Sequence, residues 1–186
     1  MANKEKNFEL YLNKLSQLGV DVSNISDEFK AKLMDASFVA TNDYGNAYRG
    51  SLLEIVLRVL TPIAIGINKL LPVDRQVDKD KLVKVCLLHH ISKAIRLIEN
   101  DERWQIEKLG KLYKYDDSLP SVRTGLHSAV LAMQEFGVSF TLEEMEAMTI
   151  NDRDPSDEQA RFHSGVLSSI VKMANELTYV QINVEK

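Results

Sequence analysis

The residues of this 186-residue chain with the clearest capacity for chemistry are two adjacent histidines, His89 and His90. They stand in an apolar stretch, residues 86–94 (CLLHHISKA), which is expected to lie in the middle of a buried helix. Neutral imidazole is a common ligand of divalent metals, so the pair considered alone indicates a metal site. Two adjacent histidines would form only a weak site by themselves, because neighbouring residues of a helix point about 100° apart.

Composition excludes several other kinds of site. The net charge of -4 argues against a general nucleic-acid or membrane-surface binder. The single cysteine, Cys86, excludes an intramolecular disulfide and a cysteine-type zinc cluster. The longest apolar segment, residues 56–71, is interrupted by charged and helix-breaking residues, and the N-terminal residues lack the apolar stretch of a signal peptide. We therefore expect a soluble, cytoplasmic protein with no membrane partner, or a virion component if the gene belongs to a phage.

The elements that must position the histidines are predicted to be almost entirely helical. Apolar residues over 8–18 form one helical stripe that ends at Gly19, and Ser26 opens a second helix, so residues 1–43 are predicted to form an N-terminal helical hairpin. A long helix from about Gly50 to Leu71 should be kinked at Pro62. The helix that contains the histidine pair should open near Asp78.

The second half of the chain is predicted to continue the bundle. Residues 104–114 indicate a charged helix or an irregular segment, and residues 113–120 a surface loop. Residues 122–136 form a helix closed by Gly137, and Thr141 with Glu144 forms a capping box that opens the next helix. A last helix should open at residues 156–159 and run towards Tyr179, and the alternating tail 180–184 indicates a short strand or a docked end. The predicted fold class is an all-α bundle.

Several separated segments, in consistent order, resemble the HD-domain superfamily, in particular small bacterial and phage HD proteins related to 3′–5′ exoribonucleases. Residues 45–55 (GNAYRGSLLEI) follow the family pattern HHAYxGGLLEH with every histidine replaced, which puts Ile55 at a ligand position. In the second motif His89 is kept and His90 stands where the family has its aspartate. The resemblance implies that residues 44–186 form an HD-like helical domain behind the 1–43 extension.

The remaining motifs follow the same trend. Residues 119–128 (LPSVRTGLHS) match a loop and helix start in which Thr124 replaces a histidine, and Asn151 occupies the place of a further polar position. In the last helix, Met173-Ala174-Asn175 puts Asn175 where the family has an aspartate.

These replacements remove the chemistry that the resemblance implies. An HD site uses two imidazoles and two carboxylates to hold a divalent metal, which lowers the pKa of a bound water. Isoleucine cannot ligate, and asparagine offers a neutral carbonyl oxygen in place of an anion. Hard divalent cations favour anionic oxygen ligands. We therefore expect that metal hydrolysis is lost and that the chain has no cofactor, with six vestigial metal-site positions: Ile55, His89, His90, Thr124, Asn151 and Asn175.

Three other arrangements stay open. A relocated metal site could draw on His90, His127, Asp152, Asp154 and His163, although the aspartates flank a proline turn where they commonly cap backbone. Arg49, Lys93 and Arg123 could gather near the old pocket and hold a phosphate without cleaving it. Trp104, Tyr113 and Tyr115 could stack on a base or a partner, or pack under a loop.

The interpretation that follows is a catalytically inactive HD-like domain that acts as a structural or protein-interaction component, with a protein partner or self-association, in a homo-oligomeric or phage-related assembly. One alternative is a metal-dependent phosphohydrolase on nucleotide or RNA ends with an atypical metal site. The other is a non-catalytic sensor that binds a nucleotide in the vestigial pocket. A nucleotide or RNA partner has less support in the sequence than a protein partner.

Overall fold

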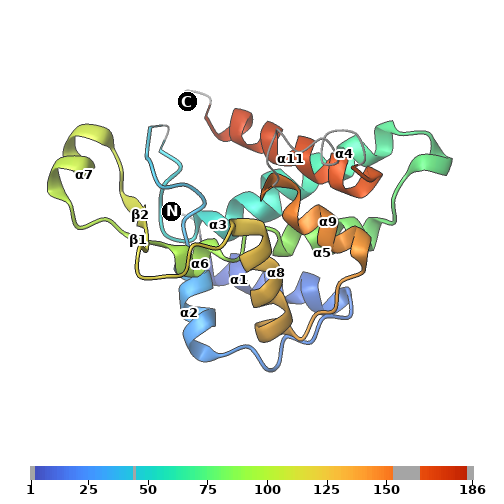
Figure 1. The fold of residues 1–186 in the computed structure, drawn as a ribbon, viewed down its shortest axis with the longest axis horizontal. Helices are drawn as coiled ribbons and strands as arrows, with labels where there is room; N and C mark the ends of the chain where they lie inside the picture. Colours follow the sequence, from blue (N-terminus) through green and yellow to red (C-terminus); the bar gives the residue numbers. More distant parts are fainter. Residues whose placement is uncertain (1–2, 44, 153–163, 184–186) are drawn as a thin grey trace.

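The computed structural model describes residues 3–43, 45–152 and 164–183 (Figure 1). These residues form a mostly helical protein, which confirms the predicted all-α class, and they add one small two-stranded sheet that was not predicted. The helices are α1 Lys4–Gln17, α2 Asp27–Asp35, α3 Ser51–Ile55, α4 Thr61–Leu70, α5 Lys79–Leu88, α6 Lys93–Arg96, α7 Arg103–Leu109, α8 Thr124–Phe136, α9 Leu142–Thr149 and α11 Val166–Ile182. A π-helical stretch covers Val56–Leu60, and 3-10 turns cover Val73–Arg75 and Ile150–Asp152. The strands are β1 Leu97–Glu99 and β2 Tyr113–Tyr115.

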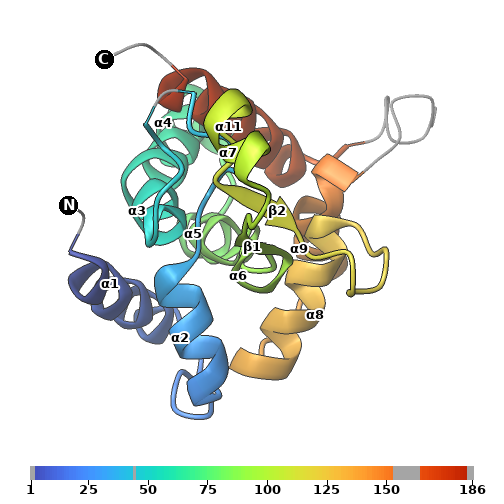
Figure 2. The ribbon, with the colours of Figure 1, turned by 90° about the vertical axis from the view of Figure 1, so that its left-hand side faces the viewer.

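The predicted N-terminal hairpin is present as α1 and α2 (Figure 2). The hydroxyl of Ser26 accepts a hydrogen bond from the amide of Phe29 at 3.3 Å, as expected for an N-cap. The phenol of Tyr11, on the buried side of α1, donates to the carbonyl of Leu87 at 3.0 Å. This bond fastens the hairpin to α5. Residues of α1 and α2 share one apolar core with α4, α5, α8, α9 and α11, and the division at residue 43 stays a prediction.

The long helix predicted around Pro62 is confirmed, because residues 51–70 are helical throughout. The π-helical stretch immediately precedes Pro62, where the ring removes an amide donor and crowds the preceding turn. By length and composition alone this helix could cross a membrane. A core helix of a soluble protein can have the same length and composition, and 56% of the most apolar part of this helix is buried inside the protein.

The helix that carries the histidine pair differs from the prediction. We expected His89 and His90 in the middle of a helix, but α5 ends at Leu88 and the two histidines lie in the turn between α5 and α6. The amide of His89 still bonds to Val85 four residues back, whereas the amide of Lys93 bonds to His90 three residues back. The backbone therefore changes from α-helical to tighter 3-10-type bonding at the histidine pair.

The segment 97–115 is a second difference. Residues 113–115, predicted as surface loop, form β2, which pairs antiparallel with β1 with Ile98 opposite Lys114. Between the strands lies the short helix α7, which buries no residue and stands away from the body as an arm (Figure 1). The three-residue strands carry too little alternation to be recognised in a sequence.

The C-terminal half follows the prediction at its helix ends. Gly137 closes α8 with φ +59°, and the capping box of α9 is complete, since the amide of Thr141 donates to Glu144 at 2.8 Å and the amide of Glu144 donates back at 3.3 Å. The tail was predicted as a strand or docked end, but α11 continues to Ile182. The predicted helix start at 156–159 lies outside the described residues.

Candidate functional site

The histidine pair lies at the C-terminal end of α5, inside the protein. Both side chains are buried, and their rings meet edge to face with centroids 4.6 Å apart. The ring of His90 also meets the ring of Phe38 edge to face at 5.0 Å. The pair is therefore enclosed by side chains on several sides.

His89 is held by an amide from the turn after α9. Its Nε2 lies 2.8 Å from Nδ2 of Asn151. An amide nitrogen is a donor, so Nε2 of His89 accepts and the ring proton resides on Nδ1. His89 is therefore a neutral imidazole of the Nδ1–H tautomer.

His90 is held by an amide from α11, in the opposite sense. Its Nε2 lies 2.7 Å from Oδ1 of Asn175. A carbonyl oxygen is an acceptor, so Nε2 of His90 donates and Nδ1 carries the lone pair. The two neighbouring rings are thus neutral and in opposite tautomers, and each is hydrogen-bonded to a neutral amide.

The electrostatic surroundings keep both rings neutral. Burial, with a smaller contribution from the nearby Lys93, lowers the pKa of His89 to about 4, while a backbone hydrogen bond with Met148 acts in the opposite direction. Burial also lowers the pKa of His90 well below its ordinary value, with Lys93 and His89 adding to the effect. The hydrogen bond with Asn175 acts in the opposite direction for His90, but both side chains bonded to the rings are neutral amides, which stabilise a charged imidazole less than a carboxylate would.

Lys93 is a buried lysine beside the histidine pair. Its Nζ donates to the carbonyl of Phe38 at 2.8 Å and to the hydroxyl of Tyr179 at 2.9 Å, and it lies 3.9 Å from the centroid of the Phe38 ring. Burial lowers the pKa of Lys93 to about 7. Phe38 and Tyr179 were not singled out in the sequence, because nothing local links residues 55 and 86 positions away from Lys93.

A divalent metal does not fit the donor set that these residues offer. Four of the six predicted positions meet in two pairs, His89 with Asn151 and His90 with Asn175, and in each pair the ring Nε2 is engaged by a neutral amide. Ile55 is buried in the apolar core. Among residues 3–43, 45–152 and 164–183, no group of three or more His, Cys, Asp or Glu side chains could hold a metal ion.

The other predicted positions have structural surroundings. The backbone carbonyl of Thr124 accepts from the hydroxyl of Ser92 at 2.9 Å, so the start of α8 is tied to the turn that holds the histidines. Asp152 caps α8, because its Oδ1 accepts from the amide of Gly125 at 3.0 Å and its Oδ2 from the amide of Leu126 at 2.7 Å. This is the backbone-capping role expected for an aspartate at that break in the chain.

The described residues of the proposed relocated metal site have other partners. Nδ1 of His127 lies 3.4 Å from a guanidinium nitrogen of Arg96, and the carboxylate of Asp152 is committed to the start of α8. Asp154 and His163 lie outside the described residues.

The three candidate phosphate contacts have different environments. Lys93 is buried beside the histidines, whereas Arg123 is exposed just before α8. Arg49 is held by Glu99, with Nε 2.7 Å and a terminal nitrogen 2.6 Å from Oε1, and it lies 3.9 Å from Asp35. A phosphate would have to displace these carboxylates to reach Arg49.

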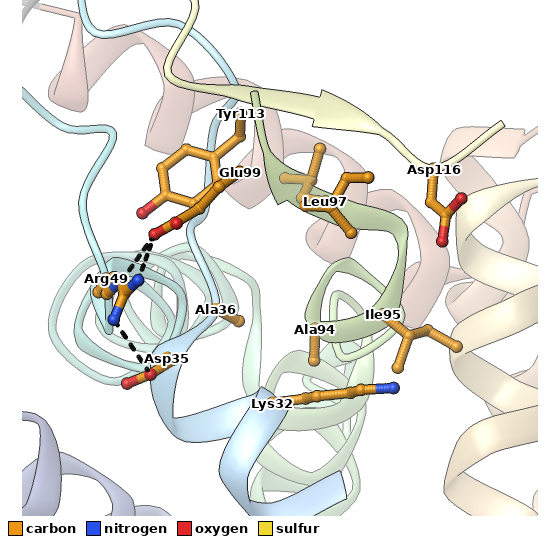
Figure 3. Close-up of a pocket in the computed structure, with 11 residues that line it drawn as sticks. Lys32, Asp35, Ala36, Arg49, Ala94, Ile95, Leu97, Glu99, Tyr113 and Asp116 are labelled. Carbon is orange, nitrogen blue, oxygen red and sulfur yellow. Dashed lines mark hydrogen bonds and ion pairs between the residues drawn. The ribbon is translucent and has the colours of Figure 1, made fainter. Parts of the chain in front are cut away.

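Arg49 lines a pocket of about 390 Å³ between α2, α6 and the two strands (Figure 3). Its floor is apolar, with Ala36, Ala94 and Leu97, and its rim is mixed in charge. The two cations Lys32 and Arg49 face three carboxylates, Asp35, Glu99 and Asp116, which leaves one net negative charge. The rim therefore disfavours phosphate.

The aromatic residues of the arm do not share one environment. Tyr113 is buried in a small apolar cluster with Ala47 and Leu97, while Trp104 and Tyr115 are exposed. The indole nitrogen of Trp104 donates to Glu102 at 3.1 Å. Packing beneath the arm accounts for Tyr113, as the sequence allowed.

The fold and this site together define an all-α protein with a buried histidine pair closed by amides. Comparison of the chain with protein-family models, with curated proteins and with solved structures gives no match.

Proposed function

We propose that this chain is a catalytically inactive HD-like domain that works as a structural or protein-interaction component. The observation that carries the proposal is that both ring Nε2 atoms of His89 and His90 bond to neutral amides, Asn151 and Asn175. In an HD site the imidazoles must offer lone pairs to a metal, and carboxylates must balance its charge. Here one Nε2 donates, the other accepts from an amide, and the anions are absent from both pairs.

The positions of these contacts support the HD resemblance behind the proposal. His89, His90, Asn151 and Asn175 stand at family positions in separated motifs that follow the same order along the chain. Asn151 lies 62 residues from His89, and Asn175 lies 85 residues from His90, yet both pairs are in hydrogen-bond contact.

The amides that replace the metal ligands leave the histidine pair buried without a metal, and this fits an assembly or interaction role. The two amide–imidazole bonds engage both Nε2 atoms without a metal and so link the helices where the metal ligands are lost, while the Nδ1 atoms of His89 and His90 are buried without a hydrogen-bond partner among the described residues. Surfaces of such a domain are then free to serve as protein interfaces, in a homo-oligomeric or phage-related assembly.

Metal analysis and an activity screen test the inactive part of the proposal. Purified protein is dialysed against manganese, its bound metal is measured, and phosphodiesterase and nucleotidase substrates are screened. The proposal expects bound metal far below one ion per chain and no turnover that depends on His89. Stoichiometric metal or turnover that His89→Ala abolishes would establish the phosphohydrolase alternative instead.

Light scattering coupled to size exclusion, with a pull-down, tests the interaction part. The proposal expects an oligomer or a captured partner, and a strict monomer with no partner would contradict it. Thermal-shift screening with nucleotides addresses the sensor alternative, since a ligand that binds only the folded state must raise its stability. A nucleotide that raises the melting temperature of the wild type and not of Lys93→Met would favour the sensor.

A further inference from the structure

The pocket between α2, α6 and the two strands has an apolar floor (Figure 3). Its volume of about 390 Å³ lies at the lower end of the range for small-molecule sites, about 300 to 1,000 Å³. The short side chains of Ala36 and Ala94 leave space above them, and Leu97 adds a larger apolar surface. Neither His89 nor His90 is among the described residues that line it. The pocket is therefore separate from the histidine pair and suits the apolar body of a small ligand.

The cations of the pocket are already neutralised. Lys32 and Arg49 are the lysine and arginine among the described residues that line it. Nζ of Lys32 lies 2.7 Å from Oε1 of Glu28, and a terminal nitrogen of Arg49 lies 2.6 Å from Oε1 of Glu99. An anionic ligand would have to displace one of these carboxylates to obtain a donor. The unused hydrogen-bonding capacity of the pocket therefore has to be sought among its acceptors.

Asp116, directly after β2, is a lining carboxylate that forms no ion pair with any described residue. Its Oδ1 accepts from the amide of Ser118 at 2.9 Å and from the hydroxyl of Ser118 at 2.6 Å, whereas its Oδ2 has no hydrogen-bond partner in the described part of the chain. The bonds from Ser118 lower the pKa of Asp116, so the carboxylate is charged at neutral pH. The lysines that act on it, Lys32 and Lys114, are both paired with other carboxylates. One unpaired negative charge thus remains at this end of the pocket.

Tyr113 supplies an unpaired hydroxyl on the other side of Leu97 (Figure 3). Only 7% of the surface of Tyr113 is exposed, yet among the described residues its hydroxyl has no hydrogen-bond partner. A tyrosine hydroxyl that is largely enclosed usually bonds to another group. Tyr113 and Asp116 are three residues apart on an extended chain, which separates their Cα atoms by about 10 Å. A small ligand lying on the apolar floor can therefore reach both polar groups.

We propose that this pocket binds a small primary amine with an apolar body. The ammonium group, which has three donors and no acceptor, donates to Oδ2 of Asp116. The body lies on the floor of Ala36, Ala94 and Leu97, and a polar group at its far end bonds to the hydroxyl of Tyr113. This ligand site goes beyond the proposed function, because it uses neither the histidine pair nor a protein interface.

Three probes of matched shape test which charge the pocket accepts. Phenethylamine, phenethyl alcohol and phenylpropionate share a phenyl ring on a short chain, and their end groups are cationic, neutral and anionic at pH 7. Changes in amide chemical shifts during NMR titration give a dissociation constant for each probe. We expect phenethylamine to bind with a Kd of about 1 mM, as its small size allows, and about ten-fold or more tightly than phenylpropionate.

An isosteric variant locates the ammonium group. Asp116→Asn keeps the shape of the side chain and an acceptor for Ser118 but removes the charge, so it should raise the Kd of phenethylamine about five- to ten-fold. The Kd of phenethyl alcohol should change little. The matched control is Asp117→Asn, the same change at the next residue, which is exposed and is not among the lining residues. That control should leave the Kd of phenethylamine within about two-fold of wild type.

Tyramine, which adds a hydroxyl to the ring of phenethylamine, tests the other end of the pocket. It should bind wild-type protein about three-fold more tightly than phenethylamine does, because its hydroxyl bonds to that of Tyr113. This advantage should vanish in Tyr113→Phe. Circular dichroism melts confirm that each variant is folded.

The outcomes decide between an amine site and its alternatives. Equal binding of phenethylamine and phenylpropionate, or an Asp116→Asn variant that binds phenethylamine as tightly as wild type, would contradict the assignment to an amine. The absence of any saturable change at residues that line the pocket would overturn the site itself. Neither result alters the metal content or the oligomeric state of the protein, so the proposed function is tested separately.

Discussion

Nε2 of His90 lies 2.7 Å from Oδ1 of Asn175, which joins the turn after α5 to the middle of α11. This hydrogen bond occupies one of the two ring nitrogens through which a histidine can bind a metal, and it uses a neutral oxygen where a metal would need an anion. The neighbouring contact between His89 and Asn151 does the same with donor and acceptor reversed. The two bonds explain how a histidine pair can be buried here without metal or charge.

Acid should destabilise the protein through the histidine pair. Burial lowers the pKa of His89 from its ordinary value of 6.5 to about 4, and that of His90 well below 6.5, so the unfolded chain binds more protons in this range. Stability is therefore full above pH 6.5 and is lost as the pH falls, with a slope of up to about 1.4 kcal/mol per pH unit for each histidine.

Urea unfolding at intervals between pH 7 and pH 5 measures this slope, in a window above the ordinary pKa values of the carboxylates. His90→Gln should reduce the slope by about half, since one of two protonations is removed. His127→Gln is the matched comparison: burial and Arg96 lower the pKa of His127 as well, but this side chain is only half-buried, so its substitution should reduce the slope less than His90→Gln does. A flat stability profile from pH 7 to pH 5 would mean that the rings accept protons freely in the folded state.

Lys93 should make stability rise on the alkaline side of neutrality. Burial lowers its pKa from 10.5 to about 7, so between these values the unfolded chain holds a proton that the folded protein has lost. The contribution of Lys93 to the free energy of unfolding is greatest above pH 10.5 and decreases as the pH drops towards 7. The useful window is pH 7 to 8.5, because burial raises the pKa of Cys86 from 9.0 to about 12 and that group acts in the opposite direction above pH 9.

The comparison is between wild type and Lys93→Met by urea unfolding across this window. Wild type should gain up to about 1.4 kcal/mol per pH unit, and the variant should lose most of that slope. The slope is the decisive quantity, because the variant also leaves the carbonyl of Phe38 without its donor. Equal slopes would show that Lys93 keeps its charge throughout.

Gly125 should tolerate no side chain. A Cβ built there would lie 2.2 Å from the carbonyl oxygen of Met148 and 2.8 Å from Oδ2 of Asp152, so α8 would have to move away from α9. We expect Gly125→Ala to cost about 2 kcal/mol or more in unfolding free energy. Gly66→Ala is the matched control, since its Cβ meets no atom and alanine is the better helix former by about 1 kcal/mol. A neutral Gly125→Ala would contradict this packing.

Restoring the family ligands should restore metal binding. The HD resemblance predicts that Ile55→His, His90→Asp and Asn175→Asp together with His89 recreate two imidazoles and two carboxylates. The triple variant should be less stable than wild type because of its buried charges, and manganese should raise its melting temperature by several degrees. Asn175→Asp alone should respond to manganese no more than wild type. A triple variant that folds and ignores manganese would count against the mapping of Ile55 onto a ligand position.

Features that depend on a few neighbouring residues could be predicted from the sequence. The capping box of Thr141 and Glu144, the helix end at Gly137 and the helix around Pro62 each follow from local hydrogen bonding or backbone restriction. Strands β1 and β2 could not be foreseen, because three residues give almost no periodic signal and the pairing spans the whole of α7. The end of α5 at Leu88 is likewise set by packing around the histidine rings, since residues 86–94 contain neither proline nor glycine.

The candidate site likewise combines features that the sequence could predict with contacts that it could not. The motifs predicted that His89, His90, Asn151 and Asn175 are vestigial positions of one metal site, but they did not predict that His89 pairs with Asn151 and His90 with Asn175. The contacts of Lys93 with Phe38 and Tyr179, and of Arg49 with Glu99, join residues that no local pattern connects. Long-range partners of this kind depend on how the helices pack, and a single sequence carries no signal for them.

The most direct test of the central claim is the manganese content of the purified protein, compared between wild type and His89→Ala after equilibration with excess metal and dialysis. The account predicts that both retain far less than one ion per chain and that the two values are equal. One tightly held ion per wild-type chain, lost in His89→Ala, would show that the histidine pair is a working metal site and would contradict the account.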